Sequence, residues 1–261
     1  MIKALFIDID GTLVSFKTHD IPCSTISALE QAHSKGIKII IATGRPLSII
    51  NNLDSISHLI DGYICTNGSH CFVGKNNVYL QPLKQETIDY IFAHCTEHNL
   101  PAVVVGVENI SVFNFSDEAQ RVFWEQIKVD CRGLSRPLDD ILKKPLLQLT
   151  PFYPIEHEKE YFPNVPDCII TRWHPSFADF SPQGVDKGKG LHKMADYLGF
   201  TIDETMGFGD GGNDIPLLIG AGIGVAMGNA TDAIKQNADF ITTTVDENGI
   251  ANALRHFGVI E

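Results

Sequence analysis

The chain has 261 residues, 44% of them hydrophobic and 20% charged, a composition typical of a globular protein and not of a disordered or fibrous one. This length predicts one large domain or two of ordinary size. With 20 Lys and Arg against 32 Asp and Glu residues the net charge is -12, which argues against nucleic-acid binding through a basic surface.

No segment of the sequence predicts export or membrane insertion. The apolar run at residues 4–7 is closed by Asp8 and is too short for a signal peptide. The longest charge-free apolar stretch, residues 215–228, contains a proline and four glycines and is too short to span a bilayer. The six cysteines form no C-x-x-C motif, so we expect reduced, mostly buried thiols in a cytoplasmic protein without membrane contact, with a pair of disulfides as the alternative.

The N-terminal part alternates apolar strands with helices. Residues 3–8 predict a buried strand that ends in carboxylates, and residues 24–36 predict a helix capped by Ser24. A second strand is predicted at residues 37–42, Pro46 suits the first turn of a second helix, and a third strand ends at residues 63–65. This order is typical of a doubly wound parallel sheet, in which functional residues gather at the carboxyl ends of the strands.

The middle of the chain follows a different pattern. Helices are predicted at residues 86–99 and 117–128, and strands at residues 102–107, 110–115, 146–149, 168–173 and 177–180. The α/β alternation then returns, with helices at residues 187–198, 212–219, 231–236 and 248–256 and strands at residues 205–209 and 223–226. We therefore predict an α/β protein with a Rossmann-like core in two parts, residues 1–82 and 184–261, and an inserted α+β domain at residues 83–183.

The most informative motif is D-I-D-G-T at residues 8–12. Asp8 and Asp10 follow the first strand, and the segment G-D-G-G-N-D at residues 209–214 places Asp210 and Asp214 after a later strand. A lone D-x-D would suit a polar turn, but four converging acids would repel one another by about 4 kcal/mol per pair at ~4 Å. A bound hard cation relieves this repulsion, and oxygen ligands alone indicate Mg²⁺.

Four motifs, in this order, resemble those of the haloacid dehalogenase superfamily, and specifically its Cof-type phosphatases with a large inserted cap. They are D-I-D-G-T at residues 8–12, A-T-G-R at 42–45, G-V-D-K-G at 184–188 and G-D-G-G-N-D at 209–214. All four lie in the predicted core, whereas the inserted domain resembles the family's cap only in size and in its mixture of strands and helices. The resemblance implies a Mg²⁺-dependent phosphatase acting on small phosphorylated metabolites, with sugar phosphates, and hexose phosphates first among them, as the expected substrates.

The resemblance also implies a role for each core residue. Asp8 is expected to be the nucleophile that forms an aspartyl-phosphate, and Asp10 the general acid and then the general base. The expected Mg²⁺ ligands are oxygen atoms of four residues: Asp8, Asp10 through its backbone carbonyl, Asp210, and Asp214 directly or through water. The phosphoryl oxygens are expected to be bound by Thr43, the amide of Gly44, Lys187 and Asn213.

Several of these side chains have ordinary alternatives. Lys187 opens a helix, where a lysine is usually solvated, but a helix start does not favour a cation, so a functional role is expected. Thr43 can cap a helix, a role compatible with phosphate binding. Arg45 can contact the substrate or pair with an acid, and Asn67 can contact the substrate or serve the turn before Gly68.

Substrate identity is expected to depend on the cap, because the core motifs contact only the phosphoryl group. The polar candidates on the last cap strands are Arg172, Trp173, His174 and Asp179, and their alternative is ordinary packing in the cap. For the ten histidines we expect no H-E-x-x-H motif and no other paired spacing of metal ligands. Most of them are therefore expected to be surface or packing residues. The sequence predicts no particular oligomeric state.

Other functions share parts of this pattern. A phosphomutase of the same superfamily has the same nucleophile but conserves the phosphoryl group. A phospho-acceptor signalling module also gathers Asp, Thr and Lys around Mg²⁺, but the length and the inserted domain argue against it. A P-type ATPase is excluded by the lack of a membrane span and by Asp10, which stands where such pumps carry Thr. The glycine pattern at Gly207, Gly209 and Gly212 matches a dinucleotide fingerprint, which is rejected because Asp210 would face the pyrophosphate.

Overall fold

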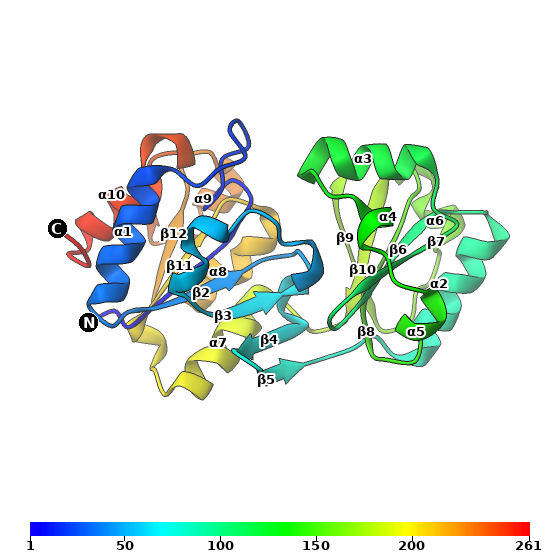
Figure 1. The fold of residues 1–261 in the computed structure, drawn as a ribbon, viewed down its shortest axis with the longest axis horizontal. Helices are drawn as coiled ribbons and strands as arrows, with labels where there is room; N and C mark the ends of the chain where they lie inside the picture. The colour runs from blue at the N-terminus through cyan, green and yellow to red at the C-terminus, as the bar shows by residue number, and fades with distance from the viewer. The chain divides into compact units, whose positions relative to one another are not determined.

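The computed structural model divides into two compact units, each containing its own sheet (Figure 1). The first unit comprises Met1–Arg45, Ile50–Leu80 and Asp186–Glu261, and the second comprises Pro46–Ile49 and Gln81–Val185. The structure describes the backbone of all 261 residues and the side chains of all but Gln126, Ile127 and Trp173. The chain passes from the first unit to the second after residue 80 and returns to the first after residue 185, close to the domain boundaries predicted after residues 82 and 183.

An eight-stranded sheet forms the centre of the first unit, with strand order β13-β12-β11-β1-β2-β3-β4-β5 (Figure 1). The first six strands of this order are parallel: β13 (Phe240–Ile241), β12 (Ile223–Ala226), β11 (Thr205–Gly209), β1 (Ala4–Ile7), β2 (Lys38–Ala42) and β3 (Ile60–Cys65). The last two, β4 (His70–Val73) and β5 (Asn76–Leu80), form an antiparallel hairpin that the sequence analysis did not predict. The predicted parallel α/β sheet is confirmed.

Helices cover both faces of this sheet. One face packs against α1 (Cys23–Ser34) and α10 (Gly249–His256), and the other against α7 (Lys187–Leu198) and α8 (Ile215–Gly220). In β1, Leu5 and Ile7 point to the first face and Ala4 and Phe6 to the second, and all four are fully buried. Since successive strand residues point to opposite faces, burial on both sides explains why these strands are continuous apolar runs.

The helix predicted to begin at Pro46 is wrong. Short 3-10 turns form there instead: η1 (Leu47–Ile49), which belongs to the second unit, and η2 (Asp54–Leu59). Ser24 does not cap α1: Pro22 is at the N-cap position, and the Ser24 hydroxyl bonds to Asn248 instead. The remaining short elements of this unit are η3 (Thr66–Gly68), η5 (Ile202–Glu204), η6 (Gly212–Asp214), α9 (Asp232–Lys235) and η7 (Val245–Glu247).

The second unit is an α+β fold, as predicted. Its antiparallel sheet has the order β7 (Ile110–Phe113), β6 (Ala102–Gly106), β8 (Leu146–Pro151), β10 (Phe177–Pro182) and β9 (Cys168–His174). Its helical elements are α2 (Gln85–Glu97), α3 (Asp117–Ile127), α4 (Cys131–Leu134), α5 (Leu138–Ile141), η4 (Ile155–His157) and α6 (Glu158–Tyr161). Ile88, Ile91 and Cys95 of α2 belong to the same buried core as Val104 and Phe180 of the sheet. This core makes the second unit a separate packed body.

All six cysteines are free thiols, and four of them are buried. Burial raises the pKa of Cys95 to about 12, so this thiol stays protonated and packs as a small apolar side chain. Among the described residues, no helix has the length and apolar character needed to cross a membrane.

The turn after β3 brings Gly68 against the start of α7. Gly68 has a φ of +97°, and a Cβ added there would lie 2.2 Å from the backbone oxygen of Asp186. Asp186 is the N-cap residue of α7, and its side chain accepts a hydrogen bond from the backbone N–H of Lys189 at 2.7 Å. Only glycine fits this approach, which places the first turn of α7 beside the carboxyl end of β3.

We expect Gly68→Ala to destabilise the protein more than the matched substitution Gly74→Ala. Both residues have positive φ, which costs an L-residue about 1–2 kcal/mol. A Cβ at Gly74 meets nothing within 4 Å, whereas the clash at Gly68 adds about 1–3 kcal/mol. Urea unfolding followed by circular dichroism measures the difference, and equal losses of stability would contradict the close approach.

Candidate active site

Acidic residues follow two neighbouring strands of the first unit. β1 and β11 run parallel, with Ile7 opposite Phe208, so Asp8 and Asp210 emerge at the same edge of the sheet. The ladder extends one step further, because the backbone N–H of Asp8 donates to the carbonyl of Phe208 at 3.1 Å. Thr43 follows β2, the other neighbour of β1. The predicted strand-end residues therefore meet at one edge.

Lys187 lies between two of the carboxylates. Its Nζ donates to Asp8 Oδ1 at 2.5 Å and to Asp214 Oδ1 at 2.6 Å, and its side chain is 0% exposed. Burial lowers the pKa of Lys187, but the two carboxylates outweigh burial and raise this pKa above its ordinary value. Lys187 is therefore a charged residue of the acidic cluster, and the solvated alternative is wrong.

Asp8 is buried in this cluster. Burial raises the pKa of Asp8 well above its ordinary value, and the neighbouring acids, Asp214 first, raise it further against the opposing effect of Lys187. Lys187 holds one carboxylate oxygen of Asp8, and the other, Oδ2, accepts no hydrogen bond from the described residues. Asp8 is thus oriented by one oxygen while the second remains available for chemistry.

Asp210 is held by two side-chain donors. Thr12 Oγ1 donates to Asp210 Oδ1 at 2.8 Å, and Asn229 Nδ2 donates to Asp210 Oδ2 at 3.0 Å and to the carbonyl of Gly11 at 2.8 Å. Burial raises the pKa of Asp210 to about 6, although the Thr12 hydrogen bond opposes it. Asn229 is not among the predicted site residues, although it lies shortly after β12, the strand that pairs with β11.

Asp214 closes the cluster from the loop after β11. Its Oδ2 accepts backbone N–H groups of Asp210 at 3.0 Å and of Gly211 at 2.8 Å, while Oδ1 accepts from Lys187. Asp214 is therefore fixed by its own loop, and it fixes that loop in turn.

The acidic cluster fits a hard divalent cation. Carboxylate oxygens of Asp8, Asp210 and Asp214 lie within 4.8 Å of one another. Three acids face one lysine, so negative charge is in excess; burial first, and then the neighbouring acids, raise the pKa values of Asp8 and Asp210. An oxygen-only set of this kind suits Mg²⁺. The backbone carbonyl of Asp10 stays a predicted ligand.

Arg45 pairs with Asp10 through two parallel hydrogen bonds. Nε donates to Asp10 Oδ2 at 2.8 Å and Nη2 donates to Oδ1 at 2.7 Å, while Nη1 reaches Asn51 Oδ1 at 3.2 Å. Such a fork fixes the orientation of a carboxylate as well as its distance. Of the two alternatives for Arg45, the structure shows the pairing with an acid, and that acid is the predicted acid/base. A contact between Arg45 and substrate stays a prediction.

The other predicted phosphate-binding residues meet around Asn67. Asn213 Nδ2 donates to Asn67 Oδ1 at 2.9 Å, and the Asn67 backbone N–H donates to the carbonyl of Thr43 at 3.1 Å. A Cβ on Gly44 would lie 3.1 Å from Asn67 Oδ1, so the Asn67 side chain packs against this glycine. Thr43 Oγ1 accepts the backbone N–H of Arg45 at 3.0 Å and so caps a turn. Asn67 therefore joins the ends of β2, β3 and β11.

Arg172 is engaged inside the second unit. Its Nη2 donates to Glu158 Oε2 at 3.0 Å. Its Nη1 lies within hydrogen-bond distance of four backbone carbonyls, those of Tyr153 at 3.2 Å, His174 at 3.5 Å, Pro175 at 3.1 Å and Phe177 at 2.9 Å. Its guanidinium also lies 4.6 Å from the centre of the Tyr153 ring. These contacts brace the turn between β9 and β10, so the structure supports the packing alternative for Arg172.

The other candidates of the second unit differ in surroundings. His174 Nδ1 accepts the backbone N–H of Ser176 at 3.2 Å, and burial followed by the charge of Arg172 lowers the pKa of His174. Asp179 is 6% exposed and accepts a hydrogen bond from Thr150 Oγ1 at 2.7 Å. The Trp173 side chain lies outside the described residues. Contacts of these residues with substrate stay predictions.

Comparison with known proteins adds the family. A model of the haloacid dehalogenase-like hydrolases matches residues 5–254. The chain belongs to this family. The solved structure of BT4131, a sugar phosphatase of HAD subclass IIB, is 46% identical to the chain, covers 99% of it and all of its own length, and superposes with a TM-score of 0.88.

Two further relatives extend over nearly the whole chain. The phosphatase BT1666 from Bacteroides thetaiotaomicron is 36% identical, with a TM-score of 0.87 and coverage of 100% of this chain and 96% of its own. The 5-amino-6-(5-phospho-D-ribitylamino)uracil phosphatase YcsE of Bacillus subtilis (strain 168) is 31% identical over 257 residues, which are 98% of this chain and 96% of YcsE. The resemblance to Cof-type phosphatases is confirmed, and the chain is a phosphoric monoester hydrolase.

We expect Mg²⁺ to raise the melting temperature near neutral pH and to raise it less as the pH falls through about 6. Asp210, whose pKa is about 6, then takes up a proton that competes with the cation. Without a cation, the contribution of Asp210 to the stability of the fold depends on pH in the opposite direction. The folded state holds the Asp210 proton more tightly than the unfolded state, so this contribution falls as the pH rises from 3.8 through about 6.

Scanning calorimetry with Mg²⁺ or with a chelator measures both effects. Asp210→Asn keeps the shape of the side chain but removes its charge, so its melting temperature should respond little to Mg²⁺. An equal response in this variant and the parent protein would show that the cation binds elsewhere.

Proposed function

We propose that the protein is a Mg²⁺-dependent phosphatase that hydrolyses sugar phosphates, preferably hexose phosphates, through an aspartyl-phosphate on Asp8. The observation that carries this proposal is the carboxylate of Asp8, buried at a strand end and held by Lys187 among further acids. The sugar-phosphate class is supported by the similarity to the sugar phosphatase BT4131. The cytoplasm remains the predicted location.

Asp8 is the nucleophile of the proposed reaction. Its Oδ2 attacks phosphorus, so that a bond from Asp8 to phosphorus forms as the bond from phosphorus to the leaving oxygen breaks. Lys187 holds Oδ1 at 2.5 Å, which fixes the direction of the attacking oxygen. The products of this step are an aspartyl-phosphate and an alcohol.

Asp10 moves the protons. In the first step it gives a proton to the leaving oxygen, and in the second it takes one from the water that attacks phosphorus, which releases inorganic phosphate and restores Asp8. Arg45 acts through Asp10 as a positioning residue, because its fork holds both carboxylate oxygens.

The phosphoryl group is bound by residues from two strand ends, those of β2 and β11, and from the first turn of α7. Thr43, the amide of Gly44, Lys187 and Asn213 are placed to bind oxygens on which negative charge accumulates during transfer. Asp8, the Asp10 carbonyl, Asp210 and Asp214 would hold Mg²⁺, which when bound supplies positive charge that offsets the phosphoryl charge.

Asp8→Asn should lower kcat by more than about 10³-fold while leaving the fold intact, because the amide is nearly isosteric with the carboxylate but is a poor nucleophile. Hydrolysis of p-nitrophenyl phosphate measures the loss, and circular dichroism checks the fold. Asp20→Asn, at an exposed acid of the same N-terminal segment, is the matched control and should retain full activity. Activity of more than a few per cent in pure Asp8→Asn protein would exclude Asp8 as the nucleophile.

Asp179 is the cap candidate that the contacts favour for binding the sugar. It belongs to a row of buried polar side chains, in which Gln148 Nε2 donates to Thr150 Oγ1 at 3.0 Å and Thr150 Oγ1 donates to Asp179 at 2.7 Å. Gln148 Oε1 is buried with no hydrogen-bond partner among the described residues. Buried acceptors in such a row suit the hydroxyl groups of a sugar.

Asp179→Asn should raise KM for the preferred hexose phosphate by about 10- to 100-fold, the worth of one hydrogen bond to a charged group, and leave hydrolysis of p-nitrophenyl phosphate nearly unchanged. Asp167→Asn, at an exposed acid of the same unit, is the control. The assay follows inorganic phosphate released from hexose, pentose and triose phosphates without a bisphosphate activator. An unchanged hexose preference would remove Asp179 from the binding site, and isomerised sugar without phosphate release would favour a phosphomutase.

A further inference from the structure

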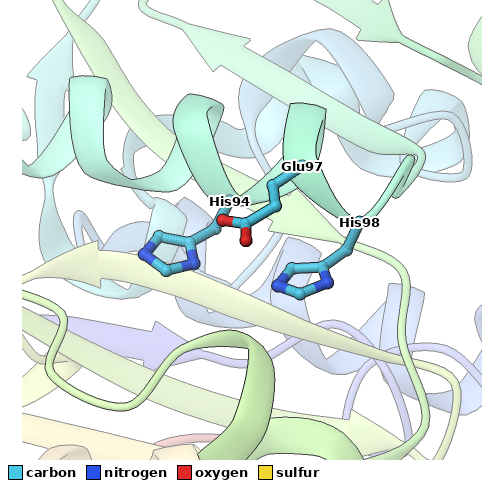
Figure 2. A group of neighbouring side chains, drawn as sticks. All are labelled: His94, Glu97 and His98. Carbon is cyan, nitrogen blue, oxygen red and sulfur yellow. The ribbon is translucent and has the colours of Figure 1, made fainter.

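A second group of potential metal ligands lies in the other unit, at the end of α2. His94, Glu97 and His98 each offer one ligand atom, and these atoms lie within 4.8 Å of one another. Residues three and four apart share a helix face, and Figure 2 shows the Glu97 carboxylate between the two imidazole rings. The expectation that the histidines contain no paired metal-ligand spacing is therefore wrong: the spacing here is H-x-x-E-H.

Aromatic neighbours orient both imidazoles. The His94 ring lies 4.3 Å from the Tyr90 ring, and the His98 ring stacks on Tyr161 of α6 at 4.3 Å. Both histidines are half-buried, whereas Glu97 is exposed. The two nitrogen donors are thus fixed by packing, and the carboxylate is free to adjust.

The three ligand atoms converge without binding one another. In the part of the chain that the structure describes, no ion pair or hydrogen bond joins Glu97 to either histidine. His94 Nδ1 is buried and has no hydrogen-bond partner among the described residues. A nitrogen in this position lacks the partner that buried polar atoms normally have.

We propose that His94, Glu97 and His98 form a binding site for a divalent cation of the zinc class. Two imidazoles and one carboxylate favour Zn²⁺ over Mg²⁺, and this donor set differs from the oxygen-only acidic cluster of the first unit. Tetrahedral Zn²⁺ requires its donors about 3.4 Å apart, so the donor atoms must approach one another on binding, and the exposed Glu97 side chain is free to rotate toward the imidazoles. The carbonyl end of the helix dipole also favours a cation at this position.

Zinc binding to the full-length protein tests the proposal. The affinity for Zn²⁺ is measured by competition with a chromogenic chelator, with excess Mg²⁺ present to occupy the acidic cluster. We expect a weaker affinity for Zn²⁺ in each of three variants: His94→Gln, His98→Gln and the surface change Glu97→Gln. Since each removes a direct ligand, the loss should exceed the roughly 10- to 100-fold that the loss of an outer-shell partner costs. Zn²⁺ should raise the melting temperature of the parent protein and lose this effect in the variants.

His157→Gln is the matched control, because His157 also stacks on Tyr161 and also contacts a glutamate but lies outside the cluster. It should bind Zn²⁺ like the parent protein. Phosphatase activity with Mg²⁺, unchanged in all four variants, verifies that each is folded, and Glu97→Gln decides the question if a histidine variant fails to fold. Equal zinc affinity in the parent protein and Glu97→Gln, or an equal loss in His157→Gln, would overturn the proposal.

Discussion

The buried ion network of Lys187 with Asp8 and Asp214 is the interaction on which the rest of the first unit depends. It joins residues 179 positions apart in the chain and lies where the ends of β1 and β11 meet the first turn of α7. A buried charge is tolerated only when it is paired, so Lys187 needs both carboxylates and they need Lys187. The correct assembly of the sheet from both ends of the chain therefore also builds the reactive site.

Local pattern and topology were enough to predict the centre of this site. Because parallel strands end at the same edge, Asp8, Thr43 and Asp210 could be placed together once the strands were recognised. The partner of Arg45 could not be predicted, because the sequence is compatible both with a contact to substrate and with an ion pair. The distance from Arg45 to Asp10 in the structure shows the ion pair. Asn229 was missed because it lies beyond the recognised motifs.

Elements without a clear hydrophobic period escaped prediction. The hairpin of β4 and β5 begins directly after a turn, and Asn76 and Asn77 interrupt its alternation. Arg172 and Asp179 are both polar residues on the last cap strands, so the sequence does not distinguish Arg172, which braces a turn, from Asp179 in its buried polar row. The pair His94 and His98 does not match the familiar motif H-E-x-x-H, because its glutamate stands in the spacing H-x-x-E-H.

Chemical trapping of the phosphoryl group tests most directly that the network serves to present Asp8 as a nucleophile. The protein is mixed with Mg²⁺ and a hexose phosphate, quenched in acid within the first turnover and reduced with borohydride, which converts an aspartyl-phosphate into homoserine. Peptide mapping by mass spectrometry then locates the reduced residue. We predict conversion at Asp8 and at no other aspartate. Conversion at a different residue, or phosphate released in the first turnover with Asp8 unmodified at every quench time, would contradict this account.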